Sequence, residues 1–245
     1  GLEDHVVLYL PFEEGFGNTT KDFSGNENNG TVYGADWIDG KLGGALSFDG
    51  VNDYVKVYDS ESLHLANTLT IEFWIKGNVQ NTSWAKIVEK DSVPSGYMVQ
   101  VWNYGPDICL RLDTDASTNQ LLGRITVLDE KWHHVAYVIN SGTVRTFLDG
   151  KFVKEENYDH GSGLSSLTNL FIGSHLGDSS FFNGMIDELR IYNKALNDTE
   201  IKWLYELTRW KFQTDFLNLK FDEKLINITD YQNNPLEAIF IPAIR

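Results

Sequence analysis

The sequence has little cysteine and no long apolar run. Its 245 residues include a single cysteine, Cys109, so an intrachain disulfide framework is excluded. The apolar neighbours of Cys109 in ICLRL favour a small buried side chain over a reactive thiol. No segment is apolar enough to cross a membrane as a helix, and we therefore expect no membrane insertion.

Basic charge and nucleophile motifs are also scarce. Lys and Arg number 20 against 35 Asp and Glu, a formal net charge of −15 at pH 7. Because nucleic-acid binding needs a basic footprint, this balance excludes a nucleic-acid partner. The sequence lacks a Gly-x-Ser-x-Gly motif. Adjacent His133 and His134 point to opposite faces of a strand, so we interpret Trp132-His133-His134 as structural.

What the chain does contain is short segments of alternating apolar and polar residues. In 69–76, Ile71, Phe73 and Ile75 share one face, which is the period-two pattern of a half-buried strand. Asp149-Gly150 is the strongest hairpin signal. We expect strands over 45–57, 69–76, 84–90, 96–103, 107–113, 121–127, 132–140, 143–149, 168–173 and 183–192, and irregular structure over 22–34. Short strands at this spacing predict an all-β, two-sheet antiparallel sandwich.

One helix is expected near the C-terminal end. Asn197 followed by Glu200 forms a capping box, and Ile201, Leu204 and Tyr205 give a helical apolar stripe that closes near 207. We interpret residues 1–207 as one domain. The segment 208–245 changes character and forms a C-terminal extension, either an arm that pairs with the sandwich or the start of a neighbouring module.

Several motifs together resemble a known family. ALSFDGVNDYVKV, LTIEFWIKG, KWHHVAYVI, TVRTFLDGKFV, LFIGS and FNGMIDELRIYNKALNDTEI occur in the order and spacing of laminin-G-like, concanavalin A-like jelly-roll domains of the bacterial and archaeal type. The resemblance covers about residues 5–206. It implies two curved antiparallel sheets, a concave face that often binds glycans and frequently a structural calcium. Because the superfamily includes lectins, adhesion modules and glycosidases, the fold does not fix the function.

The loop DFSGNENNG at 22–30 is the candidate calcium site. Calcium takes six to eight oxygen ligands. The glycines of this loop allow the backbone to curl so that its carbonyl groups point inward. The side-chain oxygens come from Asp22, Asn26, Asn28 and Asn29. The resemblance implies that Asp187 in MIDEL reaches the same ion from across the fold. The alternative is an ordinary Asn/Gly turn held by Asx hydrogen bonds.

A catalytic carboxylate pair is the rival to a binding role. Jelly-roll glycosidases carry carboxylates two apart on one face of a strand, flanking the scissile bond. In MIDELRI, Asp187 and Glu188 are adjacent, and we expect them to face opposite ways. Glu155-Glu156 is expected in a polar turn. We therefore predict that no strand carries the required pair and that the chain is not an enzyme.

Aromatic side chains indicate where a sugar would bind, because the C–H faces of sugars stack on Trp and Tyr rings. In GYMVQVWNYGPDICLRLD, Tyr97, Val99 and Val101 share one strand face, and Met98, Gln100, Trp102 and Tyr104 share the other. The candidate ligand-binding residues are Trp84, Gln100, Trp102, Asn103, Tyr104, Arg111 and His175. The alternative is that these rings pack beneath loops.

The favoured hypothesis is a non-catalytic carbohydrate-binding module, lectin-like, with a structural calcium and a glycan or polysaccharide partner. Asn-x-Ser/Thr sequons at Asn18, Asn29, Asn81, Asn197 and Asn227 weakly favour an extracellular, secreted or cell-surface location. The first alternative is a protein–protein adhesion or structural module of a large surface protein, with other surface proteins as partners. The second alternative is a polysaccharide-active hydrolase or lyase.

Overall fold

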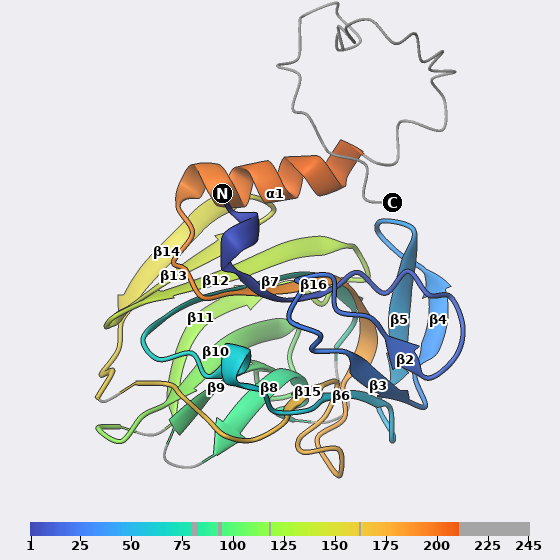
Figure 1. The fold of residues 1–245 in the computed structure, drawn as a ribbon, viewed down its shortest axis with the longest axis horizontal. Coiled ribbons are helices and arrows are strands. Elements are labelled where there is room, and N and C mark those ends of the chain that lie inside the picture. The colour runs from blue at the N-terminus through green and yellow to red at the C-terminus, as the bar shows by residue number, and fades with distance from the viewer. Residues whose placement is uncertain (80–82, 93–94, 118, 162, 211–245) are drawn as a thin grey trace, which may run out of the picture. The chain divides into compact units, whose positions relative to one another are not determined.

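The computed structural model describes residues 1–79, 83–92, 95–117, 119–161 and 163–210 (Figure 1). Over these residues the chain forms two antiparallel sheets of eight strands each and one α-helix. The predicted all-β, two-sheet jelly-roll sandwich with a single C-terminal-side helix is therefore confirmed. Within the described part of the chain, no helix combines the length and apolar character that crossing a bilayer requires.

The first sheet, called sheet A, is built around the long strand β16. Its order is β14 (Lys151–Asn157), β13 (Thr143–Leu148), β12 (His133–Asn140), β7 (Thr68–Gly77), β16 (Asn183–Tyr192), β5 (Gly44–Asp49) and β4 (Asp36–Asp39), with β1 (Val6–Leu10) paired to β16. The turn between β13 and β14 is the predicted hairpin. Asp149 and Gly150 there have φ of 50° and 71°, the left-handed values that an Asp-Gly turn supplies.

The second sheet, called sheet B, faces sheet A across the core. Its order is β11 (Gln120–Thr126), β10 (Asp107–Asp113), β9 (Ser95–Val101), β8 (Lys86–Ser92), β15 (Leu170–Ile172), β6 (Tyr54–Val57), β3 (Gly30–Tyr33) and β2 (Thr19–Thr20). Two short 3₁₀ turns, η1 (Glu3–His5) and η2 (Glu61–Leu63), complete the described elements. The expectation of irregular structure over 22–34 is wrong at its end, because β3 pairs with β6 there.

The core lies between the two sheets and follows the predicted strand faces. Ile71, Phe73 and Ile75 of β7 are fully buried in it. From the opposite sheet, Val99 and Val101 of β9 point into the same cluster. Since side chains alternate along a strand, the intervening residues of β9 are on the outer face of sheet B. This assignment locates the candidate site.

The helix α1 (Asp198–Trp210) covers the outer face of sheet A (Figure 1). The capping box is confirmed, because the backbone N–H groups of Thr199 and Glu200 donate to Asn197 Oδ1, both at 3.0 Å, and Asn197 N donates to Glu200 Oε2 at 2.9 Å. Ile201 and Leu204 pack with Ala136, Val138 and Phe147 of the sheet. A second apolar cluster therefore joins the helix to sheet A.

The helix runs further than the sequence predicts. We expected it to end near 207, but it continues to Trp210 because Thr208 is buried and its Oγ1 accepts a hydrogen bond from Trp74 Nε1 at 3.0 Å. The sequence around residue 208 does not predict this contact, because its partner is 134 residues away in the chain. Residues Gly1–Arg209 form one compact unit. Of the predicted extension 208–245, residues 211–245 lie outside the described residues.

Candidate binding face of sheet B

The outer face of sheet B carries a cluster of charged side chains at its centre. Strand register places Lys86 of β8 opposite Gln100 of β9, and Glu89 opposite Met98. On the other side of β9, Met98 faces Arg111 of β10. One charged cluster therefore spans three adjacent strands. Its members, named here the charged cluster, are Lys86, Glu89, Asp91, Arg111 and Asp113.

Four of the five side chains in this cluster have a hydrogen-bond partner close by, whereas Asp91 Oδ1 is buried without one. Lys86 Nζ donates to Gln100 Oε1, and Arg111 Nη2 donates to Asp113 Oδ2 at 2.6 Å. His175 Nδ1 lies 2.8 Å from Glu89 Oε1. These contacts hold Lys86, Glu89, Arg111 and Asp113 in a connected polar cluster.

Burial shifts the pKa values of three side chains of the charged cluster. Glu89 is only 1% exposed, and desolvation raises its pKa above the ordinary range for a glutamate. Burial lowers the pKa of Lys86, and burial followed by the neighbouring Asp113 charge raises the pKa of Asp91. These shifts favour the neutral forms, which matches a face suited to uncharged polar groups.

Aromatic side chains stand beside the charged cluster. The rings of Trp84 and Trp102 meet edge to face, with centroids 5.4 Å apart and planes at 69°. The Arg124 guanidinium carbon lies 4.7 Å from the Trp102 ring centroid. The two tryptophans, named here the tryptophan pair, are both partly exposed. A flat apolar surface is thus held next to polar groups.

The turns on either side of the tryptophan pair are tight. Trp84, Asn103 and Tyr104 have φ of 61°, 43° and 61°, left-handed values that non-glycine residues rarely adopt. Tyr104 is 55% exposed at the tip of the turn that follows β9. The backbone therefore fixes the position of the aromatic side chains at this end of the face.

The structure brings most of the predicted ligand-binding residues to this face, but in different roles. Trp84 and Trp102 touch, and Asn103 and Tyr104 follow them in an exposed turn. Gln100 is 2% exposed and accepts from Lys86, so its amide oxygen is engaged within the protein. Arg111 donates a hydrogen bond to Asp113, and His175 lies within hydrogen-bond distance of Glu89.

Sequence reasoning missed a carboxylate pair on β8. Glu89 and Asp91 are two residues apart in KIVEKDS and share the outer face, so the prediction that no strand carries such a pair is wrong. A register shift between Lys86 and Val88 interrupts the alternation of β8. Because this bulge makes the segment look non-periodic, the signal was hidden. The Glu-x-Asp spacing itself was available in the sequence.

The expectation for MIDELRI is also corrected. The pairing register of β16 with β7 shifts between Asp187 and Arg190, and Glu188 has a left-handed φ of 53°. This bulge breaks the alternation, so both carboxylates lie on the outer side of sheet A rather than on opposite faces. Burial raises the pKa of Asp187 to about 8, helped by the nearby Glu188 charge. Its Oδ2 accepts from Leu42 N at 2.9 Å.

The residues of the candidate calcium site do not fit one ion. Asp22 Oδ1 accepts from the backbone N–H groups of Tyr9 and Ser24, both at 2.9 Å. Its Oδ2 accepts from Asn28 N at 2.9 Å and from Ser24 Oγ at 2.7 Å. Four donors thus occupy the carboxylate, which is the Asx arrangement of an ordinary turn.

The other four predicted ligands differ in their surroundings. Asn29 Oδ1 accepts from Asp22 N at 2.8 Å, whereas Asp187 Oδ1 is buried without a hydrogen-bond partner. Asn28 Oδ1 accepts from Ser60 Oγ at 2.6 Å, and the Asn26 amide nitrogen lies 3.3 Å from Val6 O. Asp187 shares no hydrogen-bond partner with Asp22. Among the residues that the structure describes, no group of three His, Cys, Asp or Glu side chains is placed to hold a metal ion.

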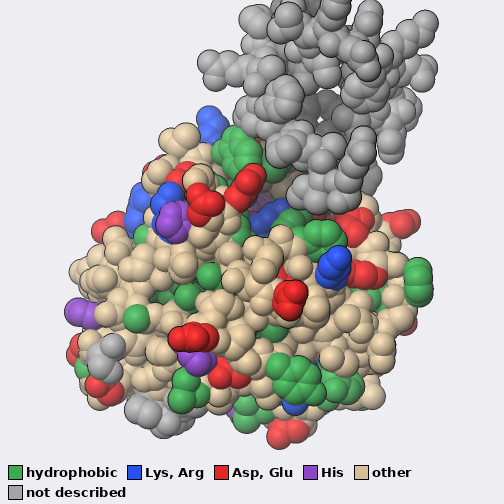
Figure 2. Space-filling view, in the orientation of Figure 1, with side chains coloured by type: hydrophobic (Ala, Val, Ile, Leu, Met, Phe, Trp, Pro, Cys, Tyr) green, Lys and Arg blue, Asp and Glu red, His purple; other side chains and the backbone are tan. Residues whose placement is uncertain are grey.

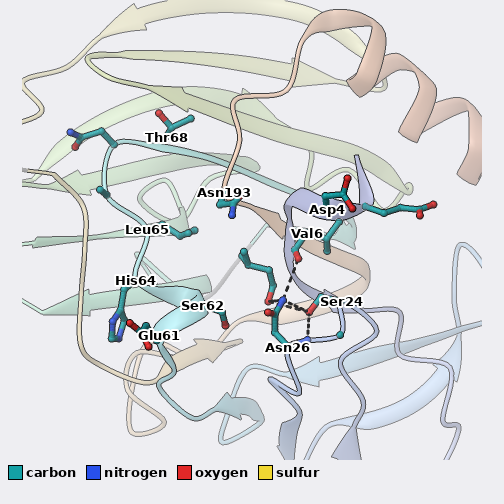
Figure 3. A pocket seen from close by; sticks show the side chains of 15 residues that line it. Asp4, Val6, Ser24, Asn26, Glu61, Ser62, His64, Leu65, Thr68 and Asn193 are labelled. Atoms are coloured by element: carbon teal, nitrogen blue, oxygen red, sulfur yellow. Dashed lines mark hydrogen bonds between the residues drawn. The ribbon is translucent and has the colours of Figure 1, made fainter. Parts of the chain in front are cut away.

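A pocket of about 810 Å³ lies away from this face, between η1, the 24–26 loop and η2 (Figure 3). Asn26 reaches Val6 and Ser24 across one wall. The lining is rich in carboxylates, amides and hydroxyls and includes no Phe, Tyr or Trp. It therefore offers a sugar ring nothing to stack on, and the outer face of sheet B is the better candidate for a glycan.

Surface charge agrees with the acidic composition. Figure 2 shows Asp and Glu side chains spread over the visible surface, with Lys and Arg side chains forming no continuous basic area in this view. The chain's formal net charge is −15. A polyanionic partner would meet repulsion over this surface.

The fold and the site together define a concanavalin A-like jelly-roll domain. Residues 49–202 match the Laminin_G_3 model, described as the concanavalin A-like lectin/glucanases superfamily, and the chain belongs to this family. The resemblance inferred from the motifs is thereby confirmed.

Two curated proteins are distantly similar. The chain is 24% identical over 256 residues to the non-toxic nonhemagglutinin type E of Clostridium botulinum, covering 94% of the chain and 21% of that protein. It is 26% identical over 200 residues to the adhesion G-protein coupled receptor V1 of Danio rerio, covering 72% of the chain and 3% of the receptor. The chain thus spans a small part of either relative.

Solved structures share the fold. The binding domain of botulinum neurotoxin serotype D superposes with a TM-score of 0.70 at 17% identity, over 96% of the chain and 56% of that structure. Domain 4 of AbnA, an extracellular arabinanase of Geobacillus stearothermophilus, in complex with arabinotriose, superposes with a TM-score of 0.64 at 19% identity, over 82% of the chain and 98% of that domain. Both neighbours are domains of larger proteins.

Proposed function

We propose that this chain is a non-catalytic carbohydrate-binding module that holds a glycan on the outer face of sheet B. The observation that carries the proposal is the tryptophan pair, a partly exposed aromatic surface beside the charged cluster. Sugar rings present an apolar face and a rim of hydroxyls, so they need an aromatic surface and polar partners together. The outer face of sheet B supplies both.

Each part of the face has a role in this proposal. A sugar ring stacks on Trp102, whose orientation is held by the Trp84 edge and by Arg124. Hydroxyl groups bond to the partly exposed polar atoms of Arg111 and His175. Asn103 and Tyr104, in the exposed turn, contact the next part of the glycan.

Two comparisons support a binding role. The family model includes lectins by its description, and the structural neighbours are binding domains, one of them in complex with arabinotriose. The arabinanase that contains this neighbour is extracellular. Together with the sequons, this supports an extracellular location for the present chain, where polysaccharides are accessible.

A glycan array tests the proposal, followed by titration of the bound glycans with the Trp102→Ala variant. We expect a defined set of bound glycans and an affinity loss of up to about tenfold, because one aromatic contact contributes up to about 1.4 kcal/mol. A folded protein that binds no glycan on the array would overturn the proposal. So would full affinity in the Trp102→Ala variant.

A second candidate function, polysaccharide hydrolysis, is favoured by the Glu89–Asp91 pair. Residues two apart on a strand lie about 6.7 Å apart along the backbone, and two carboxylates flanking a glycosidic bond are what hydrolysis needs. The raised pKa of Glu89 suits a general acid. Against it, Glu89 is almost fully buried and paired with His175.

Turnover separates the two functions. The binding module is expected to release no reducing ends from any polysaccharide that it binds. Hydrolysis that is abolished by Glu89→Gln, with glycan binding retained, would establish the enzyme instead. Asp113→Asn, which alters a carboxylate already paired with Arg111, is the matched control.

A further inference from the structure

We infer that the outer face of sheet B carries a second stacking subsite, formed by Tyr33 and Tyr54, so that the module binds an extended oligosaccharide rather than a terminal sugar. This inference rests on the proposed function, because it extends the same face. It starts from a pair of rings that the sequence analysis did not single out. Tyr33 lies in β3, where irregular structure was expected.

The two tyrosines form a flat aromatic surface. They are paired residues of β3 and β6, and their rings stack with centroids 4.4 Å apart and planes at 15°. Because Val32 and Val55 point into the core, both rings are on the outer face. Tyr33 is 39% exposed. The stacked pair therefore shows part of a ring to solvent on the same side of the sandwich as Trp102.

Neighbouring side chains hold and extend this surface. The Tyr54 ring lies 6.2 Å from that of Phe171, which shares the outer face on the adjacent strand β15, so Tyr54 is held from the side. Directly after β6, Tyr58 is 61% exposed, and Lys56 Nζ lies 4.6 Å from its ring centroid. Aromatic rings thus continue along this side of the face.

The strand order sets the distance between the two aromatic surfaces. From β9, which leads into Trp102, the order runs through β8 and β15 to β6, which carries Tyr54. Three strand spacings of about 4.8 Å place the two surfaces roughly 14 Å apart across the sheet. One sugar ring is too short to touch both, whereas an extended chain of several sugars reaches from one to the other.

The surface between them suits a neutral chain. Glu89 and Lys86 are almost fully buried, and His175, which contacts Glu89, is the more accessible polar group in the middle of the face. His175 is partly exposed there. Hydroxyl groups of the middle sugars can bond to such atoms without displacing a strong ion pair. A face of two stacking surfaces joined by a polar floor therefore matches a linear, uncharged oligosaccharide.

The test uses two chain-length series, arabino-oligosaccharides and cello-oligosaccharides, each from the disaccharide to the hexasaccharide. Calorimetric titration compares the unaltered protein with Tyr33→Ala, Tyr33→Phe, Trp102→Ala and Phe152→Ala. Phe152 is the matched control, an aromatic residue of β14 in sheet A with 48% exposure. Thermal melting checks that each variant is folded.

We expect the affinity of the unaltered protein to rise with chain length in at least one series. Tyr33→Ala should lower hexasaccharide affinity about three- to tenfold and leave disaccharide affinity unchanged, since one stacking contact is lost. Tyr33→Phe, which keeps the ring, and Phe152→Ala should bind as the unaltered protein does. Trp102→Ala should weaken both lengths.

The outcomes distinguish this inference from the function on which it rests. If Trp102→Ala loses binding but Tyr33→Ala binds the hexasaccharide normally, the second subsite is overturned and the proposed function stands. Affinity that does not depend on chain length also overturns the second subsite. If the unaltered protein binds neither series, the second subsite and the proposed function are both overturned. The same holds if Trp102→Ala binds as tightly as the unaltered protein.

Discussion

The paired charged residues on the outer faces of the two sheets differ in their surroundings. On sheet A, Glu72, His134 and Arg190 are buried near α1 and the N-terminal strand. His134 Nε2 lies 2.7 Å from Glu72 Oε2, and Arg190 Nη1 donates to Glu72 Oε1 at 2.9 Å. On sheet B, the paired charges lie beside aromatic rings that remain partly exposed. Pairing alone therefore does not distinguish the two faces, and the proposed binding role of sheet B rests on its tryptophan pair.

The same difference appears in how the carboxylates titrate. Burial alone would raise the pKa of Glu72, but Arg190 and His134 hold it below its ordinary value. Glu89 on sheet B has a raised pKa because its partner does not offset its desolvation. On sheet A, the ionised Glu72 carboxylate is thus a structural tie between His134 and Arg190. Sheet B keeps carboxylates that ionise at a cost to stability.

The largest effect is expected from breaking the charge network of sheet A. Arg190→Met leaves Glu72 and Glu188 buried without their guanidinium partner. Removing one partner of a buried ion pair costs about 3–5 kcal/mol, which denaturant unfolding measures. The matched control is Arg124→Met on sheet B, whose exposed pair with Asp107 contributes at most about 1 kcal/mol. Equal losses in the two variants would contradict the contrast between the faces.

Truncating the helix contact comes next. Leu204→Ala removes a buried side chain between α1 and sheet A and should lower the free energy of unfolding by about 2–4 kcal/mol. Glycan affinity should be unaffected, because no part of sheet B changes. A loss of glycan binding at temperatures where this variant is folded would show that the two faces are coupled.

Asp187 gives a pH-dependent effect of intermediate size. Its pKa is raised from 3.8 to about 8, so the native state holds a proton that the unfolded state has lost between these values. Stability therefore falls as pH rises from about 4 to about 8. Asp187→Asn, which keeps an acceptor for Leu42 N, should be more stable than the unaltered protein at pH 8 and lose that advantage near pH 4. A pH-independent difference between the two proteins would count against this protonation.

The smallest effect is expected from calcium. Because the Asp22 carboxylate is already held by four donors, adding calcium or a chelator should leave the melting temperature unchanged. A ligand that binds the native state must raise its stability. A calcium-dependent rise in melting temperature that Asp22→Asn abolishes would therefore restore the predicted site.

Strand alternation explains which parts of the fold were predictable. Ile71, Phe73 and Ile75 follow an unbroken period of two, and their buried face was predicted correctly. Bulges defeat the same reasoning, as Glu188 and the start of β8 show, because one inserted residue reverses every later assignment. The helix start was predictable from Asn197 and Glu200, whereas its end depends on the distant Trp74.

The candidate site was predictable only in part. Trp84 and Trp102 were found because aromatic residues are conspicuous beside polar ones. Tyr33 was missed because β3 contributes one core residue, Val32, which is too little to show alternation. The partners of Gln100 and His175 could not be predicted, because both lie on β8. Lys86 meets Gln100 through strand pairing, and Glu89 meets His175 from a loop distant in sequence.

The central claim is that the outer face of sheet B, and not that of sheet A, binds glycan. The most direct measurement is one glycan array applied to three proteins at equal concentration: the unaltered chain, Trp102→Ala and Phe152→Ala. Both variants remove one aromatic side chain, from sheet B and sheet A respectively. We predict that the array signal falls about tenfold for Trp102→Ala and is unchanged for Phe152→Ala. Equal signals from the two variants, or a loss confined to Phe152→Ala, would contradict the claim.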